Sequence, residues 1–305
     1  MAAQDTKIRK VGAPAKKKRE GNIHTRRVVG DVLAHVFLAV MSVIWLIPVI
    51  WIFFESFNKN TSPNTTTFFP TEYTFDNYIK LFTETDTLNF AAMFFRTLMI
   101  AIFTCAISLF FVLSVAYCMS RLRFIMRKPF MNFALVLGMF PGIMSVIIVY
   151  FLLQAIGLQT TSDAWVIFTL TIVYSAGTGA GFYVMKGFMD TIPMSLDEAA
   201  TLDGCTKWQV FTKIILPVTK PMIVYQAIIG FLAPWLDFVM AKVVIVSQAY
   251  YTVAPGMWLM LQKEYIYQWF ARFAAAAVCV SIPIAILFIV MQRFYAASMA
   301  GSVKG

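Results

Sequence analysis

Residues 97–118 read TLMIAIFTCAISLFFVLSVAYC, a run without a charged side chain. A helix that crosses the hydrocarbon core of a bilayer needs about 20 mostly apolar residues, so this stretch predicts a membrane-spanning helix. Continuous apolar runs of this length favour helices over barrel strands, in which apolar and polar residues alternate over about 10 residues. The stretch therefore indicates an all-α membrane protein.

Five further stretches share this character. The chain has 305 residues, of which 60% are hydrophobic and 13% charged, and its mean hydropathy is +0.74. Such a composition gives more apolar surface than one soluble core can bury, so the natural solvent of the chain is lipid. We therefore predict six membrane-spanning helices, at residues 32–54, 97–118, 130–153, 164–185, 221–245 and 273–291.

The distribution of lysine and arginine predicts the orientation of these spans. Short loops rich in these residues stay on the cytoplasmic side of a membrane. With both termini inside, the predicted inner segments hold 19 of the 25 lysines and arginines, and the outer segments hold six. The first span is longer than the apolar region of a signal peptide, about 7 to 15 residues, so we expect it to remain as an anchor.

Four segments follow from this topology. Residues 1–31 are expected to form a basic cytoplasmic tail, disordered for lack of apolar residues, and residues 32–95 the first span with an extracytoplasmic segment. Residues 96–292 hold the remaining spans and an inner loop at 186–220, and residues 293–305 form a cytoplasmic C-terminal tail. Nucleic-acid binding is the rival interpretation of the basic tail, but attraction to the anionic inner leaflet explains it more simply.

The residue types that enzymes and ion-coupled carriers need are scarce. His24 and His35 are the only histidines, so neither a histidine metal site nor a Ser–His triad has its parts. The chain contains no G-x-x-x-x-G-K-[ST] stretch, the phosphate-binding P-loop. Ionisable residues also avoid the middle of the predicted spans, where ion-coupled carriers place them. We expect no catalytic or metal site here, and an energy source in another protein.

Proline and glycine interrupt several of the predicted spans. Kinked helices around a pathway are one interpretation, and the ordinary tolerance of membrane helices for these residues is another. The sequence leaves both open. The residues concerned are Pro48, Pro141, Pro234 and Pro283, and the run GTGAG at residues 177–181.

The inner loop at residues 186–220 predicts a short helix that is stopped by a glycine. Ser195 and Glu198 have the spacing of a capping box, which predicts a helix start near Leu196. Gly204 follows at the position where a left-handed residue can end a helix without steric cost.

A second helix is predicted directly after this glycine. Thr206 and Gln209 repeat the capping spacing. The helix is expected to run through Trp208 and Phe211 toward a bend near Pro217. The loop should therefore consist of two short helices joined at a glycine hinge.

The first of these helices has the chemistry of a docking site. Ala199 and Ala200 add little bulk, so a partner can approach closely, and Glu198 offers a carboxylate near the positive helix N-terminus. An ordinary surface helix that lies against the bilayer is the alternative, which these residues alone do not exclude.

The loop resembles that of a known family. Glu198-Ala199-Ala200, three residues, Gly204, nine residues and the run IILP at 214–217 fit the EAA-x3-G-x9-I-x-L-P loop of type I ABC importer permeases, which have a six-helix MetI-like fold. Within this family the chain is similar to the maltose-type, MalG-like carbohydrate permeases. The supporting stretches are GFYVMKG at 181–187, PWLDF at 234–238 and GSVKG at 301–305.

The resemblance implies partners and a location. It implies a bacterial-type cell membrane, a homologous permease subunit that forms a heterodimer with this chain, two cytosolic ATPase subunits and an extracytoplasmic solute-binding protein. ATP and Mg would be bound by the ATPase, and this chain would hold no cofactor and bind no nucleic acid.

The resemblance also implies two sets of site residues. The coupling helix that sits in a groove of the ATPase would contain Glu198, Ala199, Ala200 and Gly204, and the tail ending at Gly305 would reach the ATPase dimer interface. The rest of the docking loop would be Ser195, Trp208, Phe211 and Pro217. A segment between the last two spans would probe the binding protein, through Tyr250, Tyr251, Thr252, Val253, Ala254, Pro255 and Gly256.

The leading hypothesis is thus a permease subunit that moves a sugar into the cell by alternating access, driven by a separate ATPase. Maltose, maltodextrin or another oligosaccharide is the preferred substrate, although the sequence identifies no residue that contacts it. The alternatives are an ABC permease for a peptide, phosphate or amino acid, and an ion-coupled secondary carrier or channel.

Overall fold

The computed structural model describes residues 20–63, 67–158 and 162–302. The chain divides into two units, Met1–Trp51 and Ile52–Gly305, and most of helix α1 (Glu20–Glu55) lies in the first. Among the described residues there is no β-strand, only an isolated bridge between Asn58 and Tyr73. The all-α prediction is confirmed.

Within the described residues, up to six segments have the length and composition of membrane spans. Three are single helices: Val28–Glu55 within α1, α3 (Phe90–Arg121) and Ile266–Gln292 within α14 (Ile266–Ser302). Three more qualify as bent pairs. These are α4 (Arg127–Gly138) with α5 (Gly142–Ala155), α6 (Asp163–Gly177) with α7 (Phe182–Asp190), and Lys207–Val218 with α11 (Lys220–Leu236). The prediction of six spans is therefore confirmed, with half of them bent.

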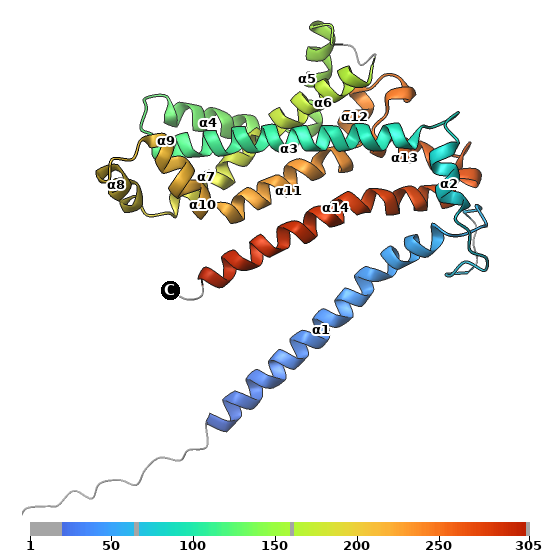
Figure 1. Cartoon of the computed structure of the whole chain (residues 1–305), viewed down its shortest axis with the longest axis horizontal. Helices are drawn as coiled ribbons and strands as arrows, with labels where there is room; N and C mark the ends of the chain where they lie inside the picture. Colours follow the sequence, from blue (N-terminus) through green and yellow to red (C-terminus); the bar gives the residue numbers. More distant parts are fainter. Residues whose placement is uncertain (1–19, 64–66, 159–161, 303–305) are drawn as a thin grey trace, which may run out of the picture. The chain divides into compact units, whose positions relative to one another are not determined.

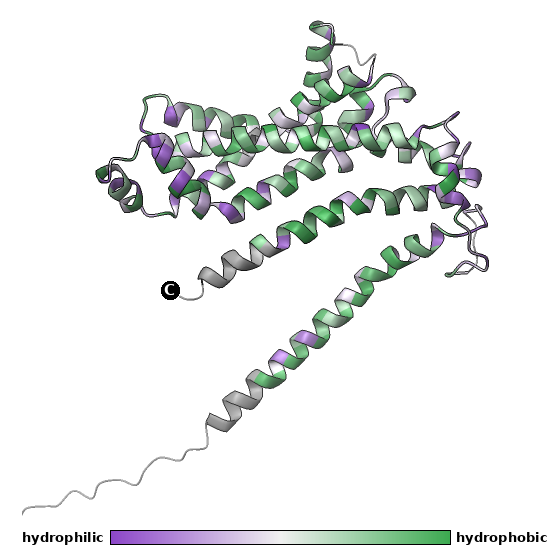
Figure 2. Ribbon diagram, viewed as in Figure 1, coloured by the Kyte–Doolittle hydropathy of each residue, from purple (hydrophilic) through white to green (hydrophobic). Residues whose placement is uncertain are grey.

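The central element of the second unit is the long helix α3, with α8 near one of its ends and α2 near the other (Figure 1). It packs against α6, α7 and α11, and near its start against α13 (Val253–Met260). Helix α14 packs on α11 and on the short helix α2 (Asp76–Thr83). Polar residues gather at the two ends of these helices and apolar ones along their middle, as Figure 2 shows.

Two hydrophobic clusters lie along α3. One contains residues from its first part, such as Met93 and Ile100, together with Trp235 and Met260. The other contains residues from its last part, such as Ala116, together with side chains of the predicted inner loop. Each end of α3 therefore has its own packed core.

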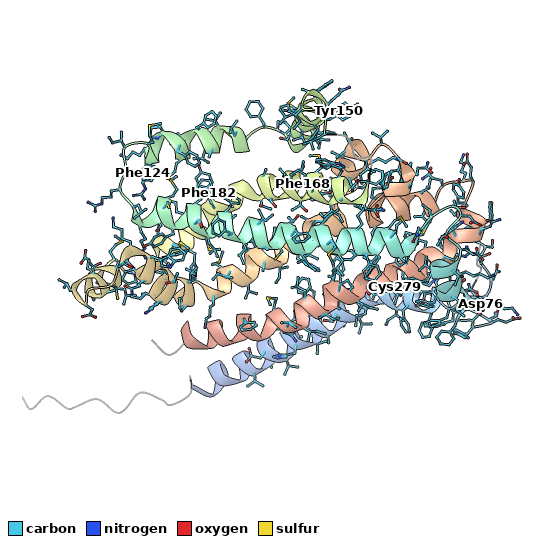
Figure 3. The ribbon with its side chains drawn as sticks, turned by 45° about the horizontal axis from the view of Figure 1, so that its top comes forward. Asp76, Phe124, Tyr150, Phe168, Phe182 and Cys279 are labelled. Carbon is cyan, nitrogen blue, oxygen red and sulfur yellow. The ribbon has the colours of Figure 1, made fainter. Side chains whose placement is uncertain are left out.

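The connecting loops divide between the two ends as the predicted topology requires. Loops that were assigned to the same side of the membrane touch one another, and Asp76 and Phe124 mark opposite ends in Figure 3. The contacts are Arg96–Asp163 and Arg272–Glu84 at one end, and Arg121–Asp197 and Ser120–Asp190 at the other. The alternation of the loops follows from these pairs, and the assignment of one end to the cytoplasm stays a prediction.

The helices at the two ends of the chain are longer than predicted. Helix α1 begins at Glu20, so the prediction of a disordered tail through residue 31 is wrong for residues 20–31. Once a span is helical, each added residue gains a backbone hydrogen bond, so the helix extends into the polar residues before it. Residues 1–19 lie outside the described residues. At the other end α14 continues to Ser302, into the predicted C-terminal tail.

Proline and glycine act differently at different sites. Pro48, Pro234 and Pro283 lie inside helices, whereas Pro141 lies at the break between α4 and α5, where the axis turns by 100°. The glycine run forms a 3-10 turn, η1 (Thr178–Gly181), between α6 and α7. The interpretation of kinked helices therefore fits Pro141 and the glycine run better than the other prolines.

The prediction that the fifth span, residues 221–245, continues as one helix to residue 245 is wrong. Helix α11 stops at Leu236, and a separate helix α12 (Val239–Val244) follows. The cause is Asp237, whose backbone is extended and whose carboxylate accepts hydrogen bonds from the N–H groups of Val239, at 3.1 Å, and Met240. A side chain that caps a new helix competes with continuation of the old one.

Candidate functional site

The start of the predicted docking helix differs from the capping box. Helix α8 spans Ser195–Leu202, so Ser195 is already inside it and its hydroxyl makes no capping hydrogen bond. The N–H groups of Leu196 and Glu198 donate instead to the carbonyl oxygens of Pro193 and Met194. The capping-box prediction for Ser195 and Glu198 is therefore wrong, because the preceding turn already satisfies these donors.

The end of α8 follows the prediction. Gly204 has a φ of +85°, in the left-handed region. The N–H of Cys205 donates to the carbonyl of Ala200 at 2.9 Å, and that of Gly204 donates to Thr201 at 3.0 Å. This pair of bonds is the Schellman arrangement, in which a left-handed residue satisfies the last carbonyls of a helix.

The second predicted helix is also present. Thr206 and Gln209 form the capping box, with the Thr206 N–H donating to the Gln209 side chain at 2.8 Å. The helix continues as α9 (Lys207–Gln209), a wider π-helical stretch η2 (Val210–Ile215) and α10 (Leu216–Val218). Pro217 lies just before the 81° bend at Thr219, after which α11 begins.

Burial divides the predicted docking residues into two groups. Glu198, Ala199 and Trp208 are exposed, as docking requires. Ala200 and Phe211 are buried in the core at this end of α3, and the Phe211 ring lies 4.6 Å from that of Tyr117. These two side chains hold the loop to its own chain, and a contact of either residue with the ATPase stays a prediction.

The most exposed apolar side chain of α8 was missed by the sequence analysis. Leu202 is 89% exposed, beside Glu198 and Thr201 on the same helix. The sequence signal that could have identified Leu202 is the presence of an apolar residue in a largely polar loop. Glu198, Ala199 and Leu202 together are called the docking face below.

One arginine holds α8 against α3. The Arg121 side chain is 4% exposed, and its guanidinium donates to the carbonyl oxygens of Met189 and Ile192 at 3.0 and 2.9 Å. The same group contacts the Met194 sulfur and lies 3.2 Å from a carboxylate oxygen of Asp197. Burial raises the pKa of the Asp197 carboxyl, with Arg121 acting in the opposite direction. Helix α8 is thereby held to the end of α3.

A second arginine has the same role at the opposite end of α3. Arg96 pairs with Asp163 at 2.5 Å, and its guanidinium donates to the carbonyl oxygens of Tyr251 and Ala249. The ring of Tyr250 lies under the guanidinium at 5.8 Å from its centre. This arginine ties both the start of α6 and residues 246–252, named the outer segment, to α3.

The predicted binding-protein residues are mostly inside the protein. Tyr251, Thr252 and Val253 are each no more than 3% exposed, and Pro255 and Gly256 are buried as well. Most of these residues are therefore not at the surface of the chain, and their contact with a binding protein stays a prediction. Of the seven residues, Tyr250 and Ala254 are half-buried.

The exposed part of the outer segment lies just before these residues. Val246 is 85% exposed, and Ser247, Gln248 and Ala249 are exposed around the short 3-10 turn η3 (Gln248–Tyr250). A partner at this end would meet residues 246–249, with the buried residues that follow acting as their support.

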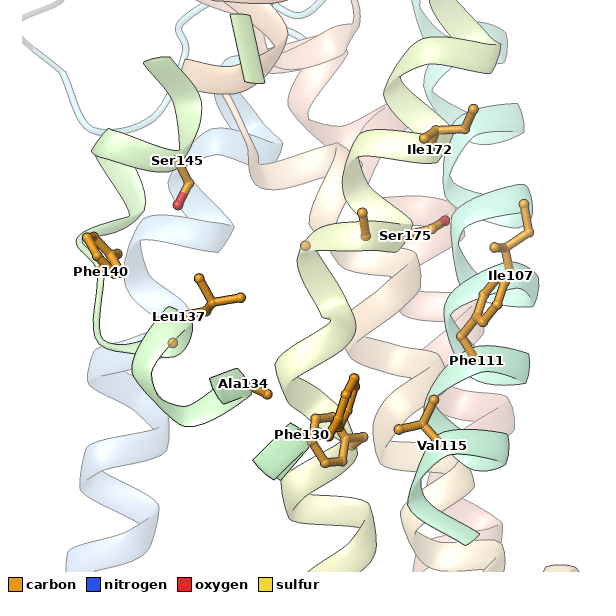
Figure 4. Close-up of a pocket in the computed structure, with 14 residues that line it drawn as sticks. Ile107, Phe111, Val115, Phe130, Ala134, Leu137, Phe140, Ser145, Ile172 and Ser175 are labelled. Atoms are coloured by element: carbon orange, nitrogen blue, oxygen red, sulfur yellow. The ribbon is translucent and has the colours of Figure 1, made fainter. Parts of the chain in front are cut away.

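A cavity of about 800 Å³ lies between α3, α4, α5 and α6 (Figure 4). Phe111 and Val115 of α3 line one side, and Phe130 and Leu137 of α4 line another. Ser145 and Ser175 supply the only side-chain hydroxyls among the described lining residues. A sugar needs many polar partners, so this cavity suits apolar groups such as lipid chains or another helix.

The helical fold and the inner loop that contains α8 define a class of protein, the helical membrane subunits of transport systems. Residues 112–301 match the family model described as "Binding-protein-dependent transport system inner membrane component". The chain belongs to this family. It is a multi-pass transport subunit rather than an enzyme, and the resemblance seen in its sequence is confirmed.

Known relatives cover almost the whole chain. It is similar to the galactooligosaccharides transport system permease protein GanQ of Bacillus subtilis, with 34% identity over 286 residues, 93% of this chain and 99% of the relative. The maltodextrin transport system permease protein MdxG of the same organism is 30% identical over 93% of this chain and 100% of the relative. A bacterial ABC transporter involved in import of the acidic polysaccharide alginate has the same fold, with a TM-score of 0.69, 20% identity and coverage of 93% and 100%.

Proposed function

We propose that this chain is a permease subunit of an ATP-driven importer that moves an oligosaccharide into the cell by alternating access. The proposal is supported by the family and by two relatives named for galactooligosaccharides and maltodextrin. A maltodextrin-like chain of sugars remains the preferred substrate. An ion-coupled carrier is set aside, because family members work with a separate binding protein.

The docking face carries this proposal. A force from an ATPase can act only on residues that a partner can reach and that do not yield under load. Glu198 and Leu202 are exposed, while Ala200 and Asp197 on the same helix are packed or paired inside. We place the ATPase, with its ATP and Mg, on this face, two copies serving the chain and a homologous permease. The end of α3 that bears α8, and both termini, are then cytoplasmic.

Two further surfaces suit the remaining partners. In the described part of the chain, α4 and α5 contain no buried residue although most of their side chains are apolar. We assign this surface to lipid and to the homologous permease subunit. The exposed residues 246–249 lie at the end of α3 away from α8, and we assign them to the extracytoplasmic binding protein.

The docking face is tested by charge reversal in the full complex, purified from native membranes through a tag on this chain. Glu198→Lys and Leu202→Glu should abolish both co-purification of the ATPase and sugar uptake, while the amount of chain in the membrane stays unchanged. Glu264→Lys, an exposed carboxylate near the other end of α3, is the matched control and should keep both. Retention of the ATPase by both docking-face variants would overturn the proposal.

The substrate is tested separately with proteoliposomes that contain the complex. ATP hydrolysis is measured with binding proteins loaded with maltodextrin, galactooligosaccharide, a peptide or phosphate. Stimulation by an oligosaccharide-loaded protein alone is the expected result. Stimulation by the peptide or phosphate form instead would keep the importer assignment and reject the sugar.

A further inference from the structure

Helix α3 differs from every other candidate span in lacking both proline and glycine. Helices kink at these residues, so a long helix without them is the stiffest available element. The other candidate spans contain such sites, which are Pro48 of α1, Pro141 between α4 and α5, Gly177 of α6, Pro234 of α11 and Pro283 of α14. Displacement of one end of α3 is therefore passed to its other end with the least loss.

Both ends of α3 are attached by a buried arginine. Arg121 binds the turn before α8 and pairs with Asp197 within it, and Arg96 binds the outer segment and the start of α6. A buried guanidinium must keep its partners, because an unpaired charge away from water is costly. Each attachment is thus held by several donors of one planar group, which resist rotation as well as separation.

The spacing of the two arginines along α3 determines the directions in which the two attachments face. They are 25 residues apart in the sequence, which is about seven helical turns and a distance of about 37 Å. A whole number of turns puts both side chains on the same side of α3. The attachments at the two ends therefore face the same direction, and a tilt or rotation of α3 moves both together.

We propose that α3 is the rigid connection between α8 and the outer segment, and that Arg121 and Arg96 are the positioning residues that fix its two ends. The inference rests on the proposed function, since α8 must receive the movement of the ATPase. A displacement of α8 then moves residues 246–249 as well. Conversely, a partner that displaces residues 246–249 moves α8.

The test uses the intact complex in proteoliposomes, with basal ATP hydrolysis, hydrolysis stimulated by the loaded binding protein, and uptake measured together. Arg121→Lys and Arg96→Lys keep the charge but lose the fork that holds several acceptors. Each should lower uptake, and the ratio of stimulated to basal hydrolysis in the same complex, by about tenfold. Arg123→Lys, at an exposed position two residues beyond Arg121, is the matched control and should behave as wild type.

A second pair of variants probes the stiffness of α3 without touching either end. Phe103 and Phe110 are exposed side chains in its middle. Replacement of both by glycine should reduce stimulation and uptake, whereas replacement of both by alanine should not, because only glycine loosens the helix.

The outcomes separate the two proposals. If no ATPase co-purifies with the wild-type chain, the proposed function fails. If the wild type is stimulated and the arginine variants are stimulated equally, only the connecting role fails. If the arginine variants do not insert, the glycine and alanine pairs decide, and equal stimulation of these two overturns the connection through α3.

Discussion

Gly256 of α13 packs directly against the sulfur atom of Met93 on α3, so closely that a Cβ atom added at Gly256 would overlap the sulfur. This contact joins the support of the outer segment to the start of the central helix. Only a residue without a side chain lets the Met93 sulfur lie this close to the backbone of α13.

Gly256→Ala should therefore destabilise the protein. Overpacking of a tight contact costs about 1 to 3 kcal/mol, and the Met93 side chain must move to make room. Thermal unfolding of the purified chain in detergent measures the effect. Gly187→Ala in α7 is the control, since nothing lies within 4 Å of a Cβ atom there, and it should not lower the midpoint. A lower midpoint for both variants would contradict the steric explanation.

Ala199 and Ala200 are adjacent but should respond oppositely to the same substitution. Ala200→Leu should destabilise the chain by about 1 to 3 kcal/mol, because Ala200 is buried. Ala199→Leu should leave the stability within about 0.5 kcal/mol but reduce the amount of co-purified ATPase, because Ala199 is exposed on the docking face. Unfolding midpoints and pull-down yields of both variants are compared, and a loss of stability with Ala199→Leu would contradict the burial pattern.

The cost of substituting Gly204 should come from its backbone conformation rather than from a lack of space for a side chain. Nothing lies within 4 Å of a Cβ atom at this position, but the φ of +85° is strained for other residues. Gly204→Ala should cost about 1 to 2 kcal/mol, and Gly204→Asn less, because asparagine tolerates the left-handed region. Hydrogen exchange of the α8 amides reports the local loss. Equal exchange in the two variants would argue against a conformational cause.

Asp237 should stabilise the start of α12 through its side chain. Asp237→Ala removes the cap, worth about 1 kcal/mol, and also the acceptor of the hydrogen bond from the buried Tyr174 hydroxyl at 2.8 Å. Asp237→Asn keeps an oxygen that can accept from Val239 and should retain most of the stability. The unfolding midpoints of the two variants should differ clearly, and an alanine variant as stable as the asparagine one would exclude the cap.

Much of the fold follows from local patterns in the sequence. Residues 97–118 lie within α3 because a long apolar run has only one satisfactory conformation in lipid, which is a helix. Gly204 and the Thr206–Gln209 box form as predicted because their hydrogen bonds join residues only a few positions apart. Sequence signals of this kind can be recognised because all the residues that determine the structure lie in one short stretch of chain.

The remaining features depend on residues distant in the sequence. Arg121 meets Asp197 and Arg96 meets Tyr251 only after the helices have packed, so no local pattern announces either contact. The burial of Ala200 and of Thr252 has the same origin, since their own types are compatible with a surface. Ser195 shows a different limit: a valid capping pattern is present, but the preceding turn had already supplied the acceptors.

The two arginines of α3 also make the length of this helix a structural requirement. One residue inserted or deleted between them would turn one arginine by about 100° relative to the other, and its acceptors would be out of reach. Substitutions of the exposed residues of α3 leave this register intact, however many accumulate. Residues of α3 can therefore be substituted more freely than they can be inserted or deleted. The number of residues between the two arginines should be the last property of the protein to change.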